Sequence, residues 1–329
     1  MPALTIRALF VTFLNGKKAK NMHVFLPIAH IGINLWLVIA LGTGVGLLSG
    51  LTGVGGGFLL TPLLLILGVP PLVAAGSSTA QIVGTSSVGS YGHWRLGNVD
   101  FRMAILLVIG GWAGGAVGVY VAKILEHGGH FHTILSFVYL IVLGFVGSAM
   151  LIESFNAIRP KRKQKNKQVP ENTKPSVMAK VVNFLPGKVY FPVSGQQMSF
   201  ILPMLLGMMV GSITSLGISG GFLMVPALIY LMKLPTKVAV GTTLFQLLFI
   251  AANVSILQAG MNHAVDPYLV ITLVLGSSVG SVVGTRLSVL MKSEHLRLVL
   301  AVVVLGVAIQ MGLGLILQPS NPFSMNITY

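Results

Sequence analysis

Charged residues are scarce in this sequence, because Asp, Glu, Lys and Arg make up only 8% of its 329 residues while 54% are hydrophobic. A soluble domain carries roughly 25% charged residues, so this chain cannot cover itself with a surface that water solvates well. Its apolar runs are long and continuous, whereas the strands of a membrane β-barrel alternate apolar and polar residues over about ten positions. The composition therefore predicts an all-α polytopic membrane protein.

Cysteine is absent from the chain, and acidic residues number only six. The lack of cysteine excludes disulfides, thiolate chemistry and cysteine-ligated metals. No Asp or Glu lies inside an apolar run, and neither a carboxylate pair nor an HExxH motif occurs, so an intramembrane enzyme has no candidate catalytic group. The histidines do not recur at metal-ligand spacing on one helix. We therefore expect no enzymatic activity, no metal and no cofactor.

Positive charge is more plentiful, since 21 Lys and Arg give a formal net charge of +15. Nine of these residues fall between Arg159 and Lys188, and most of the others lie at the ends of apolar runs. This is the distribution of the positive-inside rule rather than that of a nucleic-acid-binding surface. We therefore expect the 158–180 segment to be a solvated cytoplasmic linker, and we expect no nucleic-acid partner.

The apolar runs fall into two sets of five when they are measured against the ~20 residues that cross a bilayer. They cover 34–52, 55–68, 72–93, 103–125 and 133–152 in the first half, and 200–216, 219–232, 236–259, 267–291 and 296–317 in the second. The predicted organisation is a basic N-terminal tail (1–23), a first transmembrane repeat (24–152), a basic cytoplasmic linker (153–197), a second transmembrane repeat (198–318) and a C-terminal tail (319–329). One alternative is open at the N-terminus, where an extra crossing over 24–41 would return the basic tail to the cytoplasm.

The two halves also share sequence, since GVGGGFLLTP at 53–62 matches GISGGFLMVP at 217–226. Further matches follow in register, which indicates an internal duplication. The segments 55–68 and 219–232 are too short to cross a bilayer comfortably, so they either cross with a strong tilt or dip in as re-entrant hairpins. Either arrangement gives each half an odd number of net crossings. The sequence therefore predicts two inverted-topology repeats, a hallmark of secondary transporters, whose short half-helices meet near the midplane.

The glycines of the matched stretches lie where the short segments begin. Irregular backbone at that depth is tolerated only where it lines a cavity or is buried in protein. A helix that starts there directs free N–H groups and a partial positive charge at the cavity, and glycine lets an anion approach them closely. We expect an anion to be bound by the backbone of Gly55, Gly56, Gly57, Gly220 and Gly221. Tight helix packing is the alternative explanation for these glycines.

Other repeated residues have a structural interpretation. Glycines recur at every fourth position in two full-length segments: Gly110, Gly114 and Gly118, and Gly276, Gly280 and Gly284. We interpret both series as helix-packing ridges. Asp100 and Asp266 each stand at the start of a helix, and Pro267 occupies the first helical position after Asp266, so we interpret both carboxylates as N-caps.

Polar side chains interrupt the third segment of each half, which is otherwise apolar. They are Ser77, Ser78 and Gln81 in the first half, and Thr242, Thr243, Gln246 and Asn253 in the second. Hydrogen bonds between helices would satisfy these groups, but we favour a polar substrate cavity with Gln81 and Gln246 on opposite sides. At the end of the first of these segments, His93 and Arg95 form either an interfacial anchor or an anion-recruiting site.

Three stretches carry a family resemblance: LPIAHIGIN (26–34), GLLSGLTGVGGGFLLTPLL (46–64) and GSSTAQIVGTSSVGSYGHWRLGNVDFRM (76–103). With a weaker second copy, they resemble the TauE/SafE family of sulfite exporters over about residues 24–317. The resemblance implies a multi-pass carrier of the bacterial inner membrane that moves sulfite, a sulfonate such as sulfoacetate, or a related organic anion. The second copy has ISGGF where the first has VGGGF, so the two tips need not contribute equally.

These observations predict a secondary transporter that moves a small anion by alternating access at a midplane site between the repeats. A passive anion channel with the same architecture is one alternative. A non-transporting membrane scaffold, with the linker as its partner-binding element, is another. The expected partners are the anionic substrate and the lipid bilayer, and the sequence leaves open whether the chain forms a homo-oligomer.

Overall fold

A computed structural model describes residues 23–52, 55–129, 131–158, 187–193, 196–232, 234–290 and 293–316. The basic N-terminal tail up to residue 22, the linker between 159 and 186, and the C-terminal tail lie outside the described residues, as does Gly53 of the first glycine-rich stretch. The predictions made for those segments therefore stay predictions.

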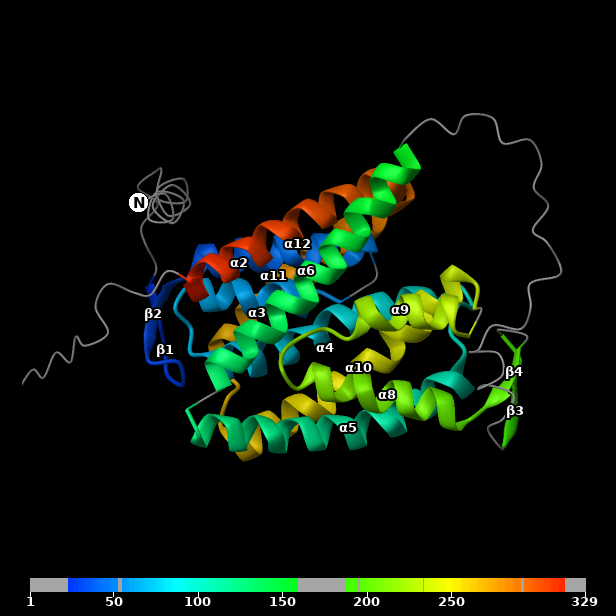
Figure 1. Cartoon of the computed structure of the whole chain (residues 1–329). Coiled ribbons are helices and arrows are strands. Elements are labelled where there is room, and N and C mark those ends of the chain that lie inside the picture. The colour runs from blue at the N-terminus through cyan, green and yellow to red at the C-terminus, as the bar shows by residue number, and fades with distance from the viewer. Residues whose placement is uncertain are drawn as a thin grey trace, which may run out of the picture.

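The described chain is dominated by helices (Figure 1). In the first half these are α2 (Leu35–Thr52), α3 (Gly57–Ile66), α4 (Pro71–Arg95), α5 (Phe101–His127) and α6 (Phe131–Ile158). In the second half they are α8 (Ile201–Thr214), α9 (Gly221–Tyr230), α10 (Thr236–Asn262), α11 (Pro267–Leu290) and α12 (Ser293–Ile316). Each helix corresponds to one predicted apolar run. The prediction of an all-α polytopic membrane fold is therefore confirmed.

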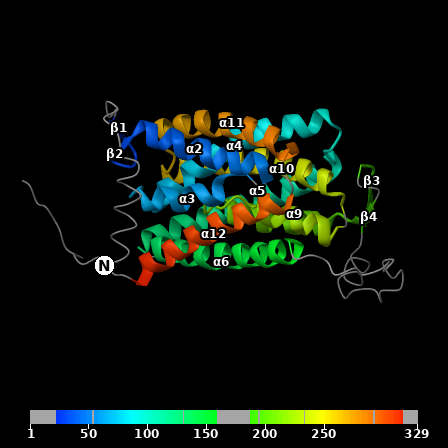
Figure 2. The same cartoon turned by 90° about the horizontal axis from the view of Figure 1, so that it is seen from above.

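Four of the described helices are long and apolar enough to cross a membrane: α5, α6, α10 and α11. Shorter apolar stretches lie in α2, α3, α8 and α12. The helices α3 and α9 have ten residues each, or about 15 Å, which is half of the ~30 Å hydrocarbon layer. They extend from the middle of the molecule toward its opposite ends (Figure 1 and Figure 2).

A short β-hairpin precedes the first helix of each half. Strands β1 (His23–Leu26) and β2 (Ile31–Asn34) pair antiparallel, and so do β3 (Lys188–Phe191) and β4 (Gln196–Ser199). The two hairpins lie at opposite ends of the molecule in both views (Figure 1 and Figure 2). In each hairpin a proline directly follows the first strand, where its missing N–H removes no ladder hydrogen bond.

These hairpins change two expectations at the edges of the repeats. The alternative of an extra crossing over 24–41 is wrong, because 23–34 form a hairpin and the helix begins only at Leu35. The apolar residues of this hairpin alternate with turn-forming residues, and His30 has a left-handed φ of 53°, so no continuous helix can form there. The segment 153–197, expected to be linker throughout, contains the end of α6 and all of β3.

The middle helices of the two halves, α4 and α10, pack against each other in antiparallel directions. A Cβ at Gly76, in the second turn of α4, would lie 2.5 Å from the carbonyl oxygen of Ala264, just past the end of α10. Gly241, early in α10, packs in the same way against Asn98, just past the end of α4. Helices α6 and α12 also run antiparallel. Corresponding helices that run in opposite directions are what an inverted repeat requires, and the duplication itself stays a prediction.

Two further close helix pairs join the first helix of one half to the fourth helix of the other. Helix α5 packs along α8, where Gly110 and Gly114 bring its backbone against Met204 and Met208. Helix α11 packs along α2 in the same manner, with Gly276 and Gly280 against Ile39 and Thr43. The interpretation of these glycines as packing ridges is therefore confirmed, because no side chain would fit at such short backbone separations.

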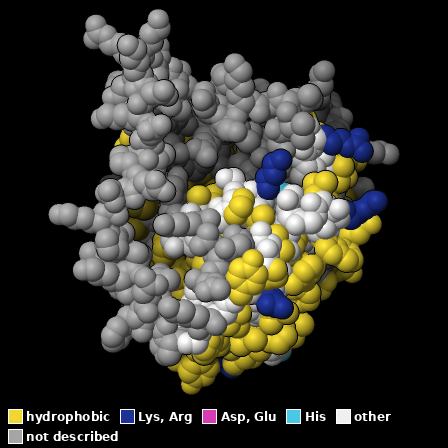
Figure 3. Space-filling model, turned by 90° about the vertical axis from the view of Figure 1, so that its right-hand side faces the viewer, with side chains coloured by type: hydrophobic (Ala, Val, Ile, Leu, Met, Phe, Trp, Pro, Cys, Tyr) yellow, Lys and Arg dark blue, Asp and Glu magenta, His cyan; other side chains and the backbone are white. Residues whose placement is uncertain are grey.

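Charged side chains of the described residues lie near the ends of the helices. Arg95, Arg102 and Lys237 are all at the end that carries β3 and β4, where Arg102 Nη1 donates a hydrogen bond to the carbonyl of Tyr190 at 3.2 Å. Figure 3 faces this end and shows cationic side chains scattered among hydrophobic ones. Lys123 lies near the end of α5, toward the other side. These cations are therefore concentrated at one end of the helices, which is the distribution that the positive-inside rule describes.

Candidate functional site

The two glycine-rich tips meet inside the bundle. The rings of Phe58 and Phe222, each one residue into its short helix, lie 5.7 Å apart between centroids. The Thr61 hydroxyl of α3 donates a hydrogen bond to the carbonyl of Gly217 at 3.2 Å. A Cβ at Gly55 would lie 2.5 Å from the Ser219 hydroxyl oxygen. The starts of α3 and α9 are therefore in direct contact, and both are buried.

Glycine is required at these tips for two separate reasons. Gly55 and Gly217 have φ angles of 79° and 77°, in the left-handed region that other residues rarely adopt. Gly56 is instead confined by its surroundings, since a Cβ there would lie 2.5 Å from Val45 Cγ1 and 3.6 Å from Gln81 Nε2. The backbone at the start of α3 thus lies close to the amide of Gln81, and the first N–H groups of the helix have no intrahelical acceptor.

Four side chains of α4 and α10 are fully buried and lack hydrogen-bond partners among the described residues. They are Ser78 and Gln81 on α4, and Thr243 and Gln246 on α10. Both polar atoms of each glutamine amide are unpartnered, so the two amides do not bond to each other. Leaving a buried polar group unsatisfied costs about 1–3 kcal/mol, and native proteins contain few such groups. We refer to these four residues as the polar quartet.

The position of the quartet argues against accidental packing. Ser78 and Gln81 occupy the same places on α4 that Thr243 and Gln246 occupy on α10, and all four have 0% exposure. The same cost therefore occurs at matched positions of both halves. The described α4 and α10 carry charged residues only near their ends, so the quartet offers neutral amide and hydroxyl groups. Such groups supply directional donors to an anion without a buried positive charge.

Ser77 and Thr242, which the sequence grouped with the quartet, have a different role. The backbone N–H of Asp266 donates to the Ser77 hydroxyl at 3.2 Å, and the N–H of Asp100 donates to the Thr242 hydroxyl at 3.0 Å. Each hydroxyl therefore satisfies a buried backbone group of the opposite half. Ser77 therefore links α4 to the start of α11, and Thr242 links α10 to the start of α5.

Asn253 lies farther along α10, where it is half-buried and its Oδ1 has no partner among the described residues. This oxygen would lie 3.8 Å from a Cβ at Gly115 of α5. Ser86 of α4 is also buried, and its hydroxyl lacks a described partner. Ser86 was not among the predicted site residues, although a polar residue within an apolar helix was the available signal.

Asp100 and Asp266 are N-caps, as the sequence predicted. Asp100 accepts a hydrogen bond from the N–H of Met103 at 3.3 Å. Asp266 accepts from the N–H groups of Tyr268 and Leu269 at 3.1 and 3.3 Å. Its second oxygen accepts from the N–H of Ile28, in the turn of the β1–β2 hairpin, at 3.0 Å. The carboxylate therefore joins the first hairpin to the start of α11.

His93 and Arg95 lie at the end of α4, near the surface and away from the tips. Arg95 is exposed, and its guanidinium carbon lies 6.0 Å from the ring centroid of Tyr91, a geometry typical of a cation–π contact. The side chain of His93 packs against Gly241 at the start of α10, and its Nδ1 is buried without a described partner. The aromatic surroundings of Arg95 favour the interfacial-anchor interpretation.

Tyr139 is a buried residue near the tips that the sequence analysis missed. It lies on α6 with 0% exposure, and its hydroxyl donates to the carbonyl of Leu216 at 3.4 Å. Leu216 directly precedes Gly217, so α6 supports the second tip through this contact. A tyrosine inside an apolar segment was the sequence signal, since a buried hydroxyl needs a partner.

Two apolar grooves, open to the outside of the molecule, lie beside the first tip between α2, α3 and α12. Their volumes are about 220 and 460 Å³, and they share Leu41, Leu63 and Val303 in their walls. Their linings are almost entirely apolar, so neither groove is the predicted polar site. Within the described ranges, no cluster of three or more His, Asp or Glu side chains could hold a metal ion.

Comparison with known proteins gives a consistent result. A family model described as Sulfite exporter TauE/SafE matches residues 38–311. Probable membrane transporter protein YjnA of Bacillus subtilis is 28% identical over 271 residues, which cover 82% of this chain and 96% of that protein. A probable membrane transporter protein of Xylella fastidiosa (strain 9a5c) is also 28% identical, over 83% of this chain and 94% of that protein.

A plant protein matches over a shorter stretch. Sulfite exporter TauE/SafE family protein 3 of Arabidopsis thaliana is 37% identical over 73 residues, which are 21% of this chain and 15% of that protein. No solved structure matches the chain.

Proposed function

Because the chain belongs to the TauE/SafE family of sulfite exporters, we propose that it is a secondary transporter of a small oxyanion such as sulfite, a sulfonate or a related organic anion. It is a multi-pass membrane protein, with four described helices long enough to cross a bilayer and full-length relatives named as probable membrane transporters. The substrate would bind where the glycine tips meet the polar quartet.

The unpartnered polar quartet is the observation that supports this site. Two amides and two hydroxyls are held in the protein interior at a cost that a bound oxyanion would remove. Gln81 Nε2 lies beside the start of α3, whose free N–H groups and partial positive charge favour an anion. An amide donor and a helix N-terminus together can hold sulfite or a sulfonate without a formal positive charge.

Full burial of the quartet also supports alternating access over an open channel. All four side chains have 0% exposure in this conformation, so an anion bound there would be sealed from both sides. Release to either side then needs a conformational change, which is the defining property of a carrier with inverted repeats.

Transport by purified protein in proteoliposomes tests the proposal. Uptake of [35S]sulfite is measured for the parent protein and for Gln81→Leu and Gln246→Leu. We expect both variants to lose at least 90% of uptake, or about 1.4 kcal/mol of stabilisation, because leucine supplies no donor. Thermal stability should stay equal or rise, because an unsatisfied buried group is removed.

The control is Ser87→Ala on α4, where the hydroxyl bonds only its own helix at Val83. It should transport normally. Unchanged uptake in both glutamine variants would remove the quartet from the site. Flux that never saturates and shows no counterflow would favour a channel instead.

A further inference from the structure

The backbone that leads into the second tip, 217–221, is held by side chains of other helices. Helix α8 ends at Thr214, and the last carbonyls of a helix lack donors within that helix. Three successive carbonyls here accept hydrogen bonds from side chains of α4, α10 and α6. The bonds run from Thr79 Oγ1 to Thr214 at 3.1 Å, from Gln258 Nε2 to Ser215 at 2.8 Å and from Tyr139 Oη to Leu216 at 3.4 Å. The chain is therefore fixed directly before Gly217.

The three donors lie in the protein interior, so water cannot take their place. Thr79, Tyr139 and Gln258 each have 0% exposure. If the backbone at 214–216 moved away, each of its three carbonyls would lose a hydrogen bond, and each loss disfavours the moved state. Gly217 adds a steric limit, because a Cβ there would lie 2.7 Å from the Cα of Ala75. The second tip is therefore held in one position.

The first tip has no matching set of donors in the described chain. When the two glutamines of the polar quartet are aligned, the positions that match the three donors are Leu244, His93 and the apolar run 301–309 of α12. Apolar side chains have no hydrogen-bond donor, and His93 lies near the end of α4, away from the tips. The two tips are therefore alike in sequence but differ in how they are held.

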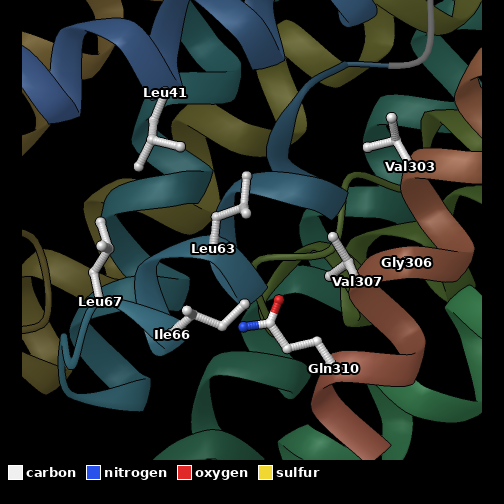
Figure 4. Close-up of a pocket in the computed structure, with 8 residues that line it drawn as sticks. All are labelled: Leu41, Leu63, Ile66, Leu67, Val303, Gly306, Val307 and Gln310. Atoms are coloured by element: carbon white, nitrogen blue, oxygen red, sulfur yellow. The ribbon is translucent and has the colours of Figure 1, made fainter. Parts of the chain in front are cut away.

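Helix α3, which begins at the first tip, has open space beside it. The two apolar grooves between α2, α3 and α12 border this helix. Figure 4 shows Leu63 and Ile66 of α3 across the smaller groove from Val307 and Gln310 of α12. Protein interiors are close-packed and transmit strain, whereas the lipid chains that fill an open groove in a membrane are fluid. Helix α3 therefore has room to shift.

We propose that Thr79, Tyr139 and Gln258 are positioning residues that keep the second tip stationary, and that α3 moves the first tip during transport. The inference rests on the proposed function and assigns its conformational change to one of the two tips. The stationary tip keeps the free N–H groups at the start of α9 directed at the anion. The hydrogen bond from Thr61 of α3 to Gly217 joins the moving tip to the stationary one, and it breaks when α3 moves.

Hydrogen exchange of the full-length protein in nanodiscs compares the two short helices without any substitution. In the absence of sulfite, the amides of 57–66 should exchange at least about tenfold faster than those of 221–230, after correction for intrinsic rates. The reason is that three buried hydrogen bonds oppose opening at the second tip. Saturating sulfite should slow exchange mainly in 57–66, because the bound anion holds the moving tip against the stationary one.

Thr79→Val and Tyr139→Phe test the donors, because each removes a hydroxyl with little change of shape. Each should speed exchange in 221–230 about fivefold and raise the KM of sulfite uptake severalfold, because the N–H groups of α9 lose their orientation.

Thr85→Val is the matched control for these two variants. Thr85 also lies on α4 and is 2% exposed, but its hydroxyl bonds the carbonyls of Gln81 and Ile82 in its own helix. This variant should match the parent protein in both the exchange of 221–230 and the KM.

Two results would overturn the inference and leave the proposed function intact. One is exchange in 221–230 that is as fast as in 57–66, or that sulfite slows equally. The other is sulfite uptake and exchange in Thr79→Val and Tyr139→Phe that equal those of Thr85→Val. Failure of the proposed function has a different signature, in which the parent takes up no sulfite and sulfite changes exchange nowhere. The difference in exchange between the two helices, and its loss in the two variants, would still test the donors.

Discussion

At the scale of single residues, neighbours on one helix have opposite roles. Ser77 and Ser78 are adjacent on α4, and both are fully buried. The Ser77 hydroxyl accepts the N–H of Asp266, while the Ser78 hydroxyl has no described partner. The sequence grouped them because both are hydroxyls in an apolar helix. Only the packing of α10 and α11 around α4 distinguishes the structural residue from the one available to a ligand.

This difference predicts opposite outcomes for two alanine substitutions. Ser77→Ala leaves the buried Asp266 N–H without its acceptor, so it should lower the free energy of unfolding by about 1–3 kcal/mol. Ser78→Ala removes a hydroxyl that bonds nothing described, so stability should be unchanged while sulfite uptake falls severalfold. Thermal unfolding and proteoliposome uptake of the same preparations measure both effects. A stability loss in Ser78→Ala equal to that in Ser77→Ala would contradict the assignment.

Asp266 is a residue whose role could be mistaken for proton coupling, because it is a fully buried carboxylate in a transporter. Its hydrogen bonds instead cap α11 and hold the turn at Ile28. Asparagine caps helices about as well as aspartate, whereas alanine costs about 0.5–2 kcal/mol. Asp266→Asn keeps one acceptor oxygen for the cap but puts an NH2 group in place of the other, which opposes the N–H of Ile28, so it should lose less stability than Asp266→Ala and leave the pH profile of uptake unchanged. Loss of the pH dependence of uptake in Asp266→Asn would assign the carboxylate to coupling.

At the scale of helices and strands, hydropathy predicted most of the architecture. The ten apolar runs correspond to the ten described helices because hydrocarbon forces each spanning segment to satisfy its own backbone. The hairpins were missed because four-residue strands carry too short an alternation to be distinguished from loop. The two hairpins nevertheless match each other in sequence, since HVFLP at 23–27 corresponds to KVYFP at 188–192.

The candidate site was predictable only in outline. The repeated glycines indicated where the tips are, and Gln81 and Gln246 were identifiable as polar groups in apolar segments. Sequence could not show that Tyr139 reaches the second tip, because α6 approaches it only through tertiary packing. Nor could the sequence show that Val45 lies between the tip and an apolar groove. Contacts between distant helices depend on packing geometry rather than on local pattern.

At the scale of the whole molecule, two matching hydrogen bonds link the halves, one from α4 to the start of α11 and one from α10 to the start of α5. The Ser77–Asp266 hydrogen bond lies toward the β1–β2 hairpin, and the Thr242–Asp100 hydrogen bond lies toward the β3–β4 hairpin. Both links are formed in this conformation, while the quartet between them is buried. The alternating access that we propose therefore predicts that these two links break one at a time.

Because the chain contains no cysteine, single introduced cysteines can test whether the two links open the site to opposite sides. Single cysteines at Ser78 and Thr243 should react with a membrane-impermeant thiol reagent from opposite sides of the membrane, because Ser78 is nearer the first link and Thr243 nearer the second. Reaction should be slow in both, since the buried conformation protects them. Leu96→Cys, which is 72% exposed at the β3–β4 end, is the accessible control. If Ser78→Cys and Thr243→Cys were modified from the same side at the same rate, the two links could not act as alternating gates, and a pore open to one side would describe the molecule better.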